Sequence, residues 1–160
     1  MKPTIPKEIS DMVRAGIWPA DGQTAGRQDV QPVIAADTIR VFAPEESGLY
    51  LYPPPFHAVQ DEIDNDKNPF WSDPRSATTE IDPRLAIIIG DFGIGSDAAI
   101  ILDYRLSLSE PRVMRLRWSE SGNHWVECAK TFAEFAGYLR TSKQNTEQTH
   151  AGVAKPPPDD

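Results

Sequence analysis

The sequence predicts an α+β fold: a single domain in which a central β-meander is flanked by an N-terminal and a C-terminal helix. Continuous apolar runs at residues 85–89 and 98–102 are typical of strands that are covered on both faces. Residues 112–118 alternate between apolar and polar side chains, which is typical of a further strand. Residues 131–139 combine a helix-capping signal with apolar side chains at helical spacing. The short loop between the first two runs predicts a hairpin, and we expect a sheet that is mainly antiparallel or mixed.

The length and composition fit one domain with a tail. A chain of 160 residues, of which 39% are hydrophobic, is long enough to bury a sizeable core. We expect the domain to span residues 1–140. Residues 141–160 should form a disordered C-terminal tail, because the chain turns polar at Thr141 and ends in Lys-Pro-Pro-Pro-Asp-Asp.

The N-terminal half carries weaker signals. Apolar residues at helical spacing predict a short amphipathic helix over residues 5–15. The next stretch, up to Ala36, has no clear periodicity, and we expect a loop. Residues 38–42 and 49–52 are rich in β-branched and aromatic side chains and predict strands, the second of which is stopped by three prolines.

Residues 57–80 are expected to be a long, irregular and acidic connection. Connections of this length inside a compact domain are usually functional or mobile. The acidic residues begin with the spacing of a calcium-binding loop, but Pro69 and Arg75 stand where that loop needs a glycine and a glutamate. We therefore expect a solvated acidic loop.

If the chain binds a protein, this connection is the predicted contact surface. Its acidic side chains would attract a basic partner, and its aromatic side chains would serve as anchors. Trp71 could equally fold back as a lid on the core. The residues predicted for this surface are Asp61, Glu62, Asp64, Asp66, Phe70 and Trp71.

The loop between the two apolar runs contains a kinase-like Asp-Phe-Gly and a Gly-x-Gly-x-x-Ala pattern of the dinucleotide-binding type. A dinucleotide-binding turn leads into a helix, whose N-terminus holds the phosphates. Here the loop leads into a second strand at Ala98, and the kinase catalytic loop does not occur in the sequence. We therefore expect a structural turn and no nucleotide. Glycines would supply its backbone angles, and aspartates would cap it or pair with arginines. Its residues are Gly90, Asp91, Gly93, Gly95 and Asp97.

The third strand of the meander is expected to be half-exposed. Met114, Leu116 and Trp118 would lie on one face, and Arg115 and Arg117 on the other.

The C-terminal helix has the clearest signals in the sequence. Thr131 is the predicted N-cap, and Glu134, three residues on, completes a capping box. An apolar stripe would lie on the sheet, formed by Phe132, Phe135, Ala136 and Leu139.

Charge and cysteine content limit the partners. The net charge of −8 disfavours nucleic acids and anionic membrane surfaces, and it would attract a basic protein. The single cysteine, Cys128, excludes an internal disulfide and fits a reducing compartment. No apolar run approaches the length of a membrane span. We expect a cytoplasmic protein without cofactor or metal.

No complete catalytic constellation is evident in the sequence. The three histidines are scattered, and His124 with Cys128 makes only two of the three or four ligands that zinc needs. A small hydrolase would have to use Asp91 or Asp97, or Cys128 as a nucleophile. A deep site that gathers Asp91, Asp97 and His57 would favour chemistry, whereas a shallow acidic face would favour a partner.

Three segments carry a family resemblance. Residues 87–103, IIIGDFGIGSDAAIILD, form a Gly-rich strand–loop–strand core. Residues 111–118, PRVMRLRW, contain a valine-bearing third strand. Residues 126–139, VECAKTFAEFAGYL, contain the pattern Ala-x-Thr-Phe-x-Glu-Phe-x-x-x-Leu. In this order the segments are similar to the SUKH superfamily, which includes fungal cell-wall assembly regulators and bacterial immunity proteins. The N-terminal half departs from the family pattern.

The resemblance implies an α+β domain that acts by binding rather than by catalysis. It implies a bacterial immunity protein that neutralises a cognate toxin, for example a basic toxin domain. A signalling or scaffold adaptor of the same fold is the alternative. The small hydrolase named above is the third candidate.

Overall fold

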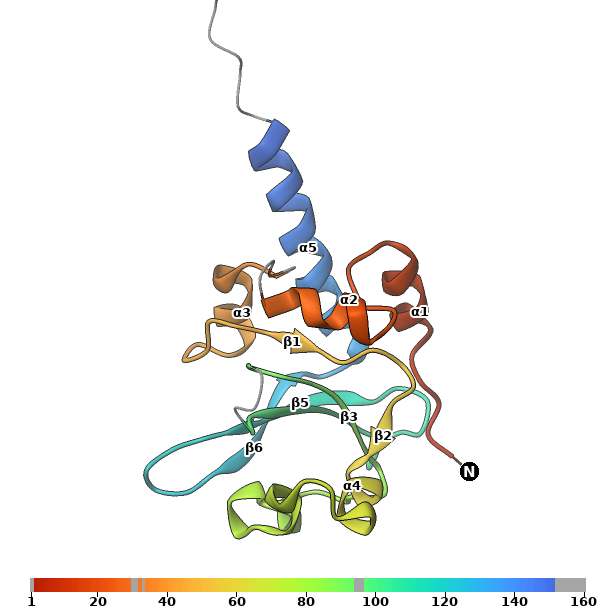
Figure 1. Ribbon diagram of the computed structural model, residues 1–160, viewed down its shortest axis with the longest axis vertical. Coiled ribbons are helices and arrows are strands. Elements are labelled where there is room, and N and C mark those ends of the chain that lie inside the picture. The colour runs from red at the N-terminus through yellow and green to blue at the C-terminus, as the bar shows by residue number, and fades with distance from the viewer. Residues whose placement is uncertain (1, 30–31, 33, 94–96, 152–160) are drawn as a thin grey trace, which may run out of the picture.

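The protein is an α+β domain built on one antiparallel sheet (Figure 1). The computed structural model describes residues 2–29, 32, 34–93 and 97–151, and within these the side chains up to Thr141 except that of Asp29. Within these residues the sheet has the strand order β1-β3-β4-β5-β6, and β2 also pairs with β3. The strands are β1 (Tyr50–Leu51), β2 (His57–Ala58), β3 (Ala86–Asp91), β4 (Ala99–Asp103), β5 (Arg112–Arg117) and β6 (His124–Ala129).

The predicted meander is confirmed. β3 and β4 form a hairpin whose register pairs Ile88 with Ile101, and β4 in turn pairs Ile101 with Met114 of β5. Every residue of β4 is buried, as the continuous apolar run predicts for a strand covered on both faces. The sheet therefore separates two hydrophobic clusters, one on each face.

The expectation of a half-exposed third strand is wrong. Arg115 is 4% exposed, whereas Trp118, just beyond the end of β5, is 41% exposed. The reason is that β6 pairs with the outer edge of β5 and that helices cover both faces of the sheet. β6 was not predicted, because its sequence mixes His124, Glu127 and Cys128 with apolar residues and shows no clear alternation.

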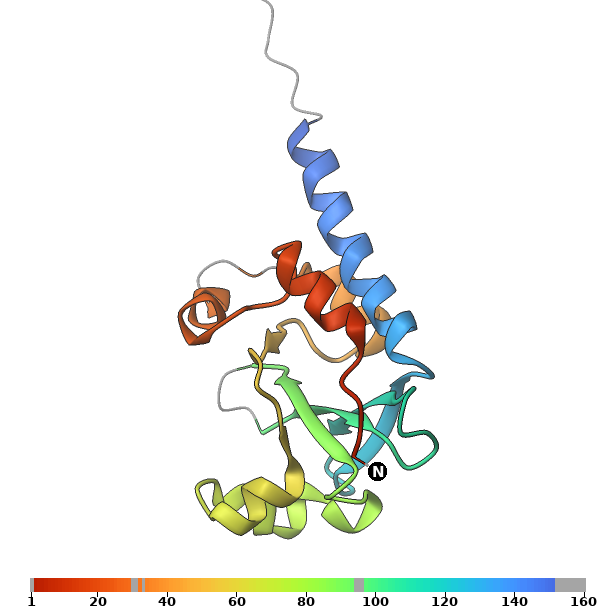
Figure 2. The same ribbon diagram turned by 90° about the vertical axis from the view of Figure 1, so that its right-hand side faces the viewer.

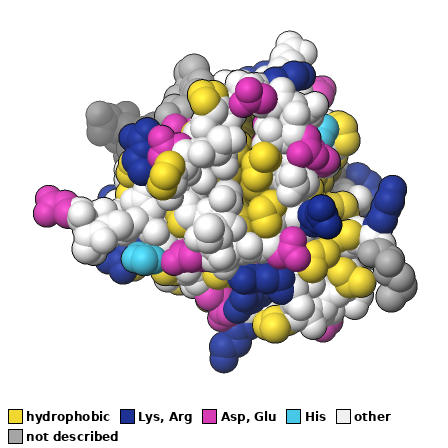
Figure 3. Space-filling model, turned by 90° about the horizontal axis from the view of Figure 1, so that it is seen from below, with side chains coloured by type: hydrophobic (Ala, Val, Ile, Leu, Met, Phe, Trp, Pro, Cys, Tyr) yellow, Lys and Arg dark blue, Asp and Glu magenta, His cyan; other side chains and the backbone are white. Residues whose placement is uncertain are grey.

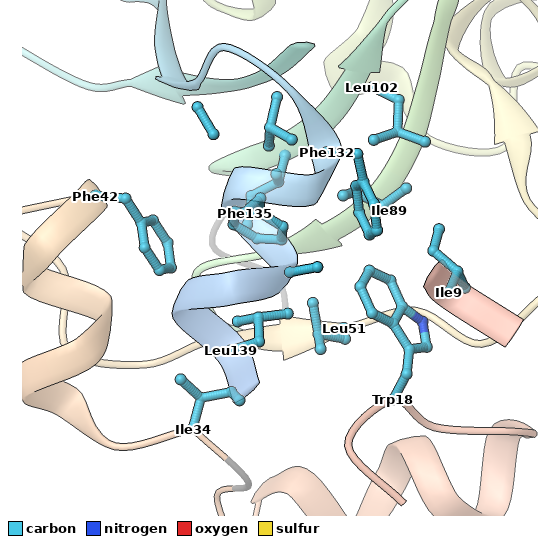
Figure 4. Packing of buried hydrophobic residues seen from close by; sticks show 14 of the residues in the cluster. Ile9, Trp18, Ile34, Phe42, Leu51, Ile89, Leu102, Phe132, Phe135 and Leu139 are labelled. Atoms are coloured by element: carbon cyan, nitrogen blue, oxygen red, sulfur yellow. The ribbon is translucent and has the colours of Figure 1, made fainter. Parts of the chain in front are cut away.

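One face of the sheet is covered by α1 (Lys7–Arg14), α3 (Ala36–Phe42) and α5 (Phe132–Ala151) (Figure 2). The predicted N-cap of α5 is confirmed: Thr131 Oγ1 accepts a hydrogen bond from the Glu134 amide at 3.2 Å. The second bond of the predicted capping box differs, because the Glu134 carboxylate accepts at 2.9 Å from the amide of Lys130, one residue before the N-cap. The apolar stripe of α5 points into the core beside Ile89 and Phe42 (Figure 4), and its members, Phe132, Phe135, Ala136 and Leu139, are at most 3% exposed.

Two predictions for the N-terminal half are wrong. Residues 38–42 form the helix α3 rather than a strand. Ile39 and Phe42, three positions apart, are buried, and the Phe42 ring packs on Phe135 of α5 with centroids 5.2 Å apart. This packing outweighs the β propensity of the segment. The expected loop before Ala36 contains α2 (Gly22–Gly26), followed by the 3-10 helix η1 (Arg27–Asp29).

The opposite face of the sheet is covered by residues 57–80, which are not the irregular connection that the sequence predicts. After β2 they form a helix and three short 3-10 helices, α4 (Val59–Asn65), η2 (Pro69–Ser72), η3 (Pro74–Ser76) and η4 (Thr78–Glu80). Phe70 and Trp71 are 7% and 5% exposed. Both belong to the hydrophobic cluster on this face of the sheet. This agrees with the alternative prediction, in which Trp71 folds back onto the core.

Residues from Thr141 onward were expected to be a disordered tail. The structure continues α5 as a helix to Ala151, projecting away from the sheet (Figures 1 and 2), and residues 152–160 lie outside the described part. Residues 141–151 contain neither glycine nor proline, so nothing in them breaks the helix. The mobility of this segment and the domain boundary at residue 140 stay predictions.

Candidate functional site

A hollow of about 460 Å³ lies on the face of the sheet that carries α4. Its floor contains Ile88 of β3 and Ala99 of β4. One wall is formed by the segment that joins β1 to β2, residues 52–56, together with His57 of β2, and the other by α4 and η2. Figure 3 views the molecule from this side and shows acidic, basic and hydrophobic side chains interspersed on it.

The wall at η2 consists of aromatic side chains that stack on other aromatic residues. Phe70 stacks on Trp118 with ring centroids 5.9 Å apart, and Trp71 stacks on Trp125 of β6 at 6.3 Å. The Trp125 indole nitrogen donates to the Ser76 carbonyl at 3.0 Å, which fixes the ring. Tertiary stacking therefore holds Phe70 and Trp71 in place.

The opposite wall is a proline-rich segment anchored to the N-terminal region. Prolines 53–55 line the hollow between Tyr52 and Phe56. The Trp18 indole nitrogen donates to the Tyr52 carbonyl at 2.8 Å, and the Phe56 ring meets Trp18 edge to face at 6.2 Å. Proline also fixes the backbone, so this wall has little freedom to move.

Three carboxylates line the hollow. Asp91 is 5% exposed, and its Oδ1 accepts a hydrogen bond from the Ala98 amide at 3.2 Å. Asp97 and Glu62 are half-buried. The lining contains no lysine or arginine among the described residues.

The pKa of the Tyr52 hydroxyl is affected by its burial and by these carboxylates. Burial raises the pKa of Tyr52 well above its ordinary value, and the negative charges of Asp91, Asp97 and Glu62 add to the effect. Because three carboxylates and neither lysine nor arginine line the described part of the hollow, the hollow is suited to a cation.

The hollow is lined by Asp91, Asp97 and His57. From the sequence, a deep site that gathers these three residues is expected to favour catalysis. Carboxylates and an imidazole can exchange protons with a bound molecule. Within the described lining there is no serine, threonine, cysteine or lysine. Among the described lining residues, a covalent mechanism would therefore need a carboxylate, His57 or Tyr52 as its nucleophile.

The cysteine candidate lies elsewhere and is unsuited to nucleophilic attack. Cys128 sits within β6 and packs against the cluster under α1, α3 and α5. Burial raises the pKa of the Cys128 thiol to about 12, so the thiol is protonated at neutral pH. The possible base His124 pairs instead with Glu80 at 2.6 Å.

The predicted contact surface divides into two groups. Asp61, Glu62 and Asp64 lie on α4 and Asp66 at its C-terminal end, and all four are exposed or half-buried. The Asp61 carboxylate also accepts from the Ala58 amide at 3.0 Å, at the start of α4. The aromatic members of the predicted surface are wall residues of the hollow and do not project as anchors.

The loop predicted to be structural joins β3 to β4, and no helix follows it. Asp91 caps the hairpin through the Ala98 amide, as expected for an aspartate in a turn. Gly90 is required by close approach rather than by an unusual backbone angle, since a Cβ there would lie 2.7 Å from the Tyr50 carbonyl oxygen. The positive φ of 54° belongs to Asp97. Gly93 is half-buried, and Gly95 lies outside the described residues.

Sequence reasoning missed the contribution of residues 52–56. The run Tyr-Pro-Pro-Pro-Phe was interpreted only as the end of a strand, although an aromatic–proline segment is also a common wall of binding grooves.

In the described part of the chain, no group of three or more histidine, cysteine or acidic residues is arranged to hold a metal ion. None of the described helices has both the length and the apolar character needed to cross a bilayer. No family model, curated protein or solved structure matches this chain, so the resemblance to the SUKH superfamily stays a prediction.

Proposed function

We propose that this chain is a non-enzymatic binding domain for a basic protein, and that it neutralises a cognate toxin as a bacterial immunity protein does. The observation that carries the proposal is the continuity between α4 and the hollow. Glu62 lies on the same helix as the exposed carboxylates of Asp61 and Asp64 and also lines the aromatic-walled cavity. Charged and aromatic groups together are the usual components of a protein-recognition site.

The charge of the chain supports a basic protein as the partner. A net charge of −8 attracts a cationic protein over a distance and accelerates its association, and it repels the phosphates of nucleic acids. An immunity protein has to bind before its toxin acts, so a fast association is advantageous. The single cysteine supports a cytoplasmic location.

Co-expression tests the proposal directly. The chain is co-purified with the product of the neighbouring gene, and the toxicity of that product is measured with and without the chain. The expected result is a stable complex and rescue of growth. Absence of both would remove the immunity role. A complex without toxicity would favour the adaptor of the same fold.

A matched pair of variants tests the surface. Asp64→Lys reverses an exposed charge on α4, and Asp37→Lys reverses an exposed charge on α3, across the sheet. We expect Asp64→Lys to slow association about tenfold at low salt, and Asp37→Lys to change it little. Equal effects of the two would mean that only the total charge matters and that α4 is not the contact surface.

A small hydrolase is the second candidate, because Asp91, Asp97 and His57 line one hollow. A panel of model esters, amides and phosphate esters tests it. Turnover that is lost in Asp97→Asn, but kept in a variant outside the hollow such as Asp66→Asn, would establish an enzyme in place of a binding domain.

A further inference from the structure

We propose that the hollow beside α4 is a receptor for a cationic side chain, foremost an arginine, that the protein partner inserts. This inference rests on the proposed function and specifies how the partner is recognised. It reverses the expectation from the sequence, in which Phe70 and Trp71 are anchors that enter the partner. In the structure these two rings are walls, and the partner supplies the inserted group.

The lining matches the chemistry of a guanidinium group. Tyr52, Phe56, Phe70 and Trp71 provide aromatic surface, on which a planar cation stacks favourably. Three carboxylates, Glu62, Asp91 and Asp97, provide acceptors for its N–H groups. An anion would meet repulsion there, and a neutral apolar group would not use the charges of Glu62 and Asp97.

No lysine or arginine belongs to the described lining of the hollow. Arg75 interacts with the charge of Asp97, but its guanidinium is held by Asp73 through two hydrogen bonds of 3.0 Å, and Arg75 does not line the hollow. The half-buried carboxylates of Glu62 and Asp97 can therefore attract a cation from outside.

The walls are preorganised, which lowers the cost of binding. Phe70 and Trp71 are held by their stacks on Trp118 and Trp125, and the opposite wall is fixed by prolines and by Trp18. Little side-chain freedom has to be lost when a cation enters. The volume of about 460 Å³ also falls within the range of ligand-binding pockets.

The exposed acids of α4 favour a cation carried by a protein over a free small molecule. Asp61 and Asp64 extend the negative surface beyond the hollow, where they would face further basic residues next to the inserted side chain. A small cation would fill the hollow and leave this surface without a role.

The test uses the full chain and three probes in amide-resolved NMR titrations at low salt. The probes are the blocked peptide Gly-Gly-Arg-Gly-Gly, the same peptide with citrulline in place of arginine, and agmatine. Citrulline keeps the shape of arginine but lacks its charge. We expect saturable shifts at the amides of Tyr52, Glu62 and Asp97 with the arginine peptide, and none with the citrulline peptide. Equal shifts with both peptides, or none with either, would overturn the proposal. Saturation by agmatine alone would overturn the assignment to a protein-borne cation.

Two aspartates provide a matched pair of variants. Asp97 and Asp66 both have left-handed backbones, with φ of 54° and 49°, a conformation that asparagine also tolerates. Asp97 lines the hollow and Asp66 does not. Asp97→Asn should weaken the binding of the arginine peptide about fivefold to tenfold. Asp66→Asn should weaken it less than about twofold. Equal effects would indicate nonspecific attraction by net charge and would count against a built site.

The outcomes separate this inference from the proposed function. A partner that co-purifies and is unaffected by Asp97→Asn, together with no peptide binding, would overturn the arginine receptor and leave the binding domain intact. Specific peptide binding without any partner or rescue would support the receptor and remove the immunity role.

Discussion

Arg115 of β5 donates a hydrogen bond from Nη2 to Oε1 of Glu45, and the two atoms are 2.5 Å apart. The arginine side chain is 5% exposed, whereas that of Glu45 is 38% exposed. The guanidinium also lies over the Phe92 ring, 5.8 Å from its centre. Two other nitrogen atoms of Arg115, Nε and Nη1, are buried without a hydrogen-bond partner among the described residues. The glutamate is thus the main compensation for a buried positive charge.

Glu45→Gln should therefore destabilise the protein. Removing one partner of a buried ion pair leaves an uncompensated charge, and solvent at the half-exposed Glu45 reduces the loss to about 1–3 kcal/mol. Urea unfolding measures it. The control is Asp37→Asn, which breaks an exposed pair with Arg40 and should have no measurable effect. Equal stability of the two variants would mean that water already compensates Arg115.

Asp103 should make the stability of the protein sensitive to acid. Its side chain is 1% exposed and accepts from Arg105 Nε at 2.9 Å and Arg112 Nε at 2.7 Å. Burial by itself would raise the pKa of Asp103, but the hydrogen bonds from Arg105 and Arg112 outweigh it and hold the pKa below the ordinary value of 3.8. A carboxyl whose pKa is lower in the folded than in the unfolded protein stabilises the fold at a pH above its unfolded-state pKa. This stabilisation is lost as the pH falls through the folded-state pKa.

Asp103→Asn tests this linkage. The variant should lose about 1–3 kcal/mol at neutral pH, because two arginines lose their counter-charge. Its free energy of unfolding should then decline less steeply than that of the wild type below about pH 4. The measurement is urea unfolding from pH 7 to pH 2. If the free energies of unfolding of the two proteins fell in parallel with pH, Asp103 would not contribute to the loss of stability in acid.

The meander and α5 could be predicted because their signals are local. A continuous apolar run marks β4, and the spacing of Phe132 and Phe135 marks the buried face of α5. For α3 the local signal was misleading, since its β-branched residues favour a strand while Ile39 and Phe42 dock on a helix that lies about 90 residues later. Such a contact leaves no trace in the segment itself.

The candidate site could be predicted only in part for the same reason. Asp91, Asp97 and His57 were named as a group, and the hollow gathers them. The walls were not predicted, because they depend on β3 pairing with both β1 and β2, which brings the proline segment opposite η2. The burial of Phe70 and Trp71 depends in turn on Trp118 and Trp125, whose positions follow from β5 and β6.

Phe135→Ala should be the most destabilising of the substitutions in α5. The side chain is fully buried between α3 and the sheet, so the transfer and cavity terms together should cost about 3–5 kcal/mol. Thr131→Ala removes only the cap to Glu134 and should cost about 1 kcal/mol. Thermal or urea unfolding measures both. A harmless Phe135→Ala would mean that α5 is not docked as described.

Truncation after Arg140 should leave the stability nearly unchanged. Leu139 is the last residue of the apolar stripe, and Arg140 and Thr141 are exposed. The helix beyond them projects away from the sheet (Figure 2). We expect a melting temperature within about two degrees of that of the full chain. A larger loss would place residues 141–160 in the folded unit and move the domain boundary.

The Gly-rich loop should bind no nucleotide. The described residues 97 and 98 lead directly into the strand β4 at Ala99, so a helix N-terminus that could hold phosphates does not follow the loop. Asp91 and Asp97 add negative charge at its two ends, which repels phosphate further. Isothermal titration with ATP and NAD, each with and without magnesium, should give no binding heat. The decisive contrary result is a micromolar signal that disappears in Gly93→Ala and persists in Gly137→Ala. Gly137 lies in α5, where an added Cβ meets no atom within 4 Å, so that variant reports only the general effect of replacing a glycine.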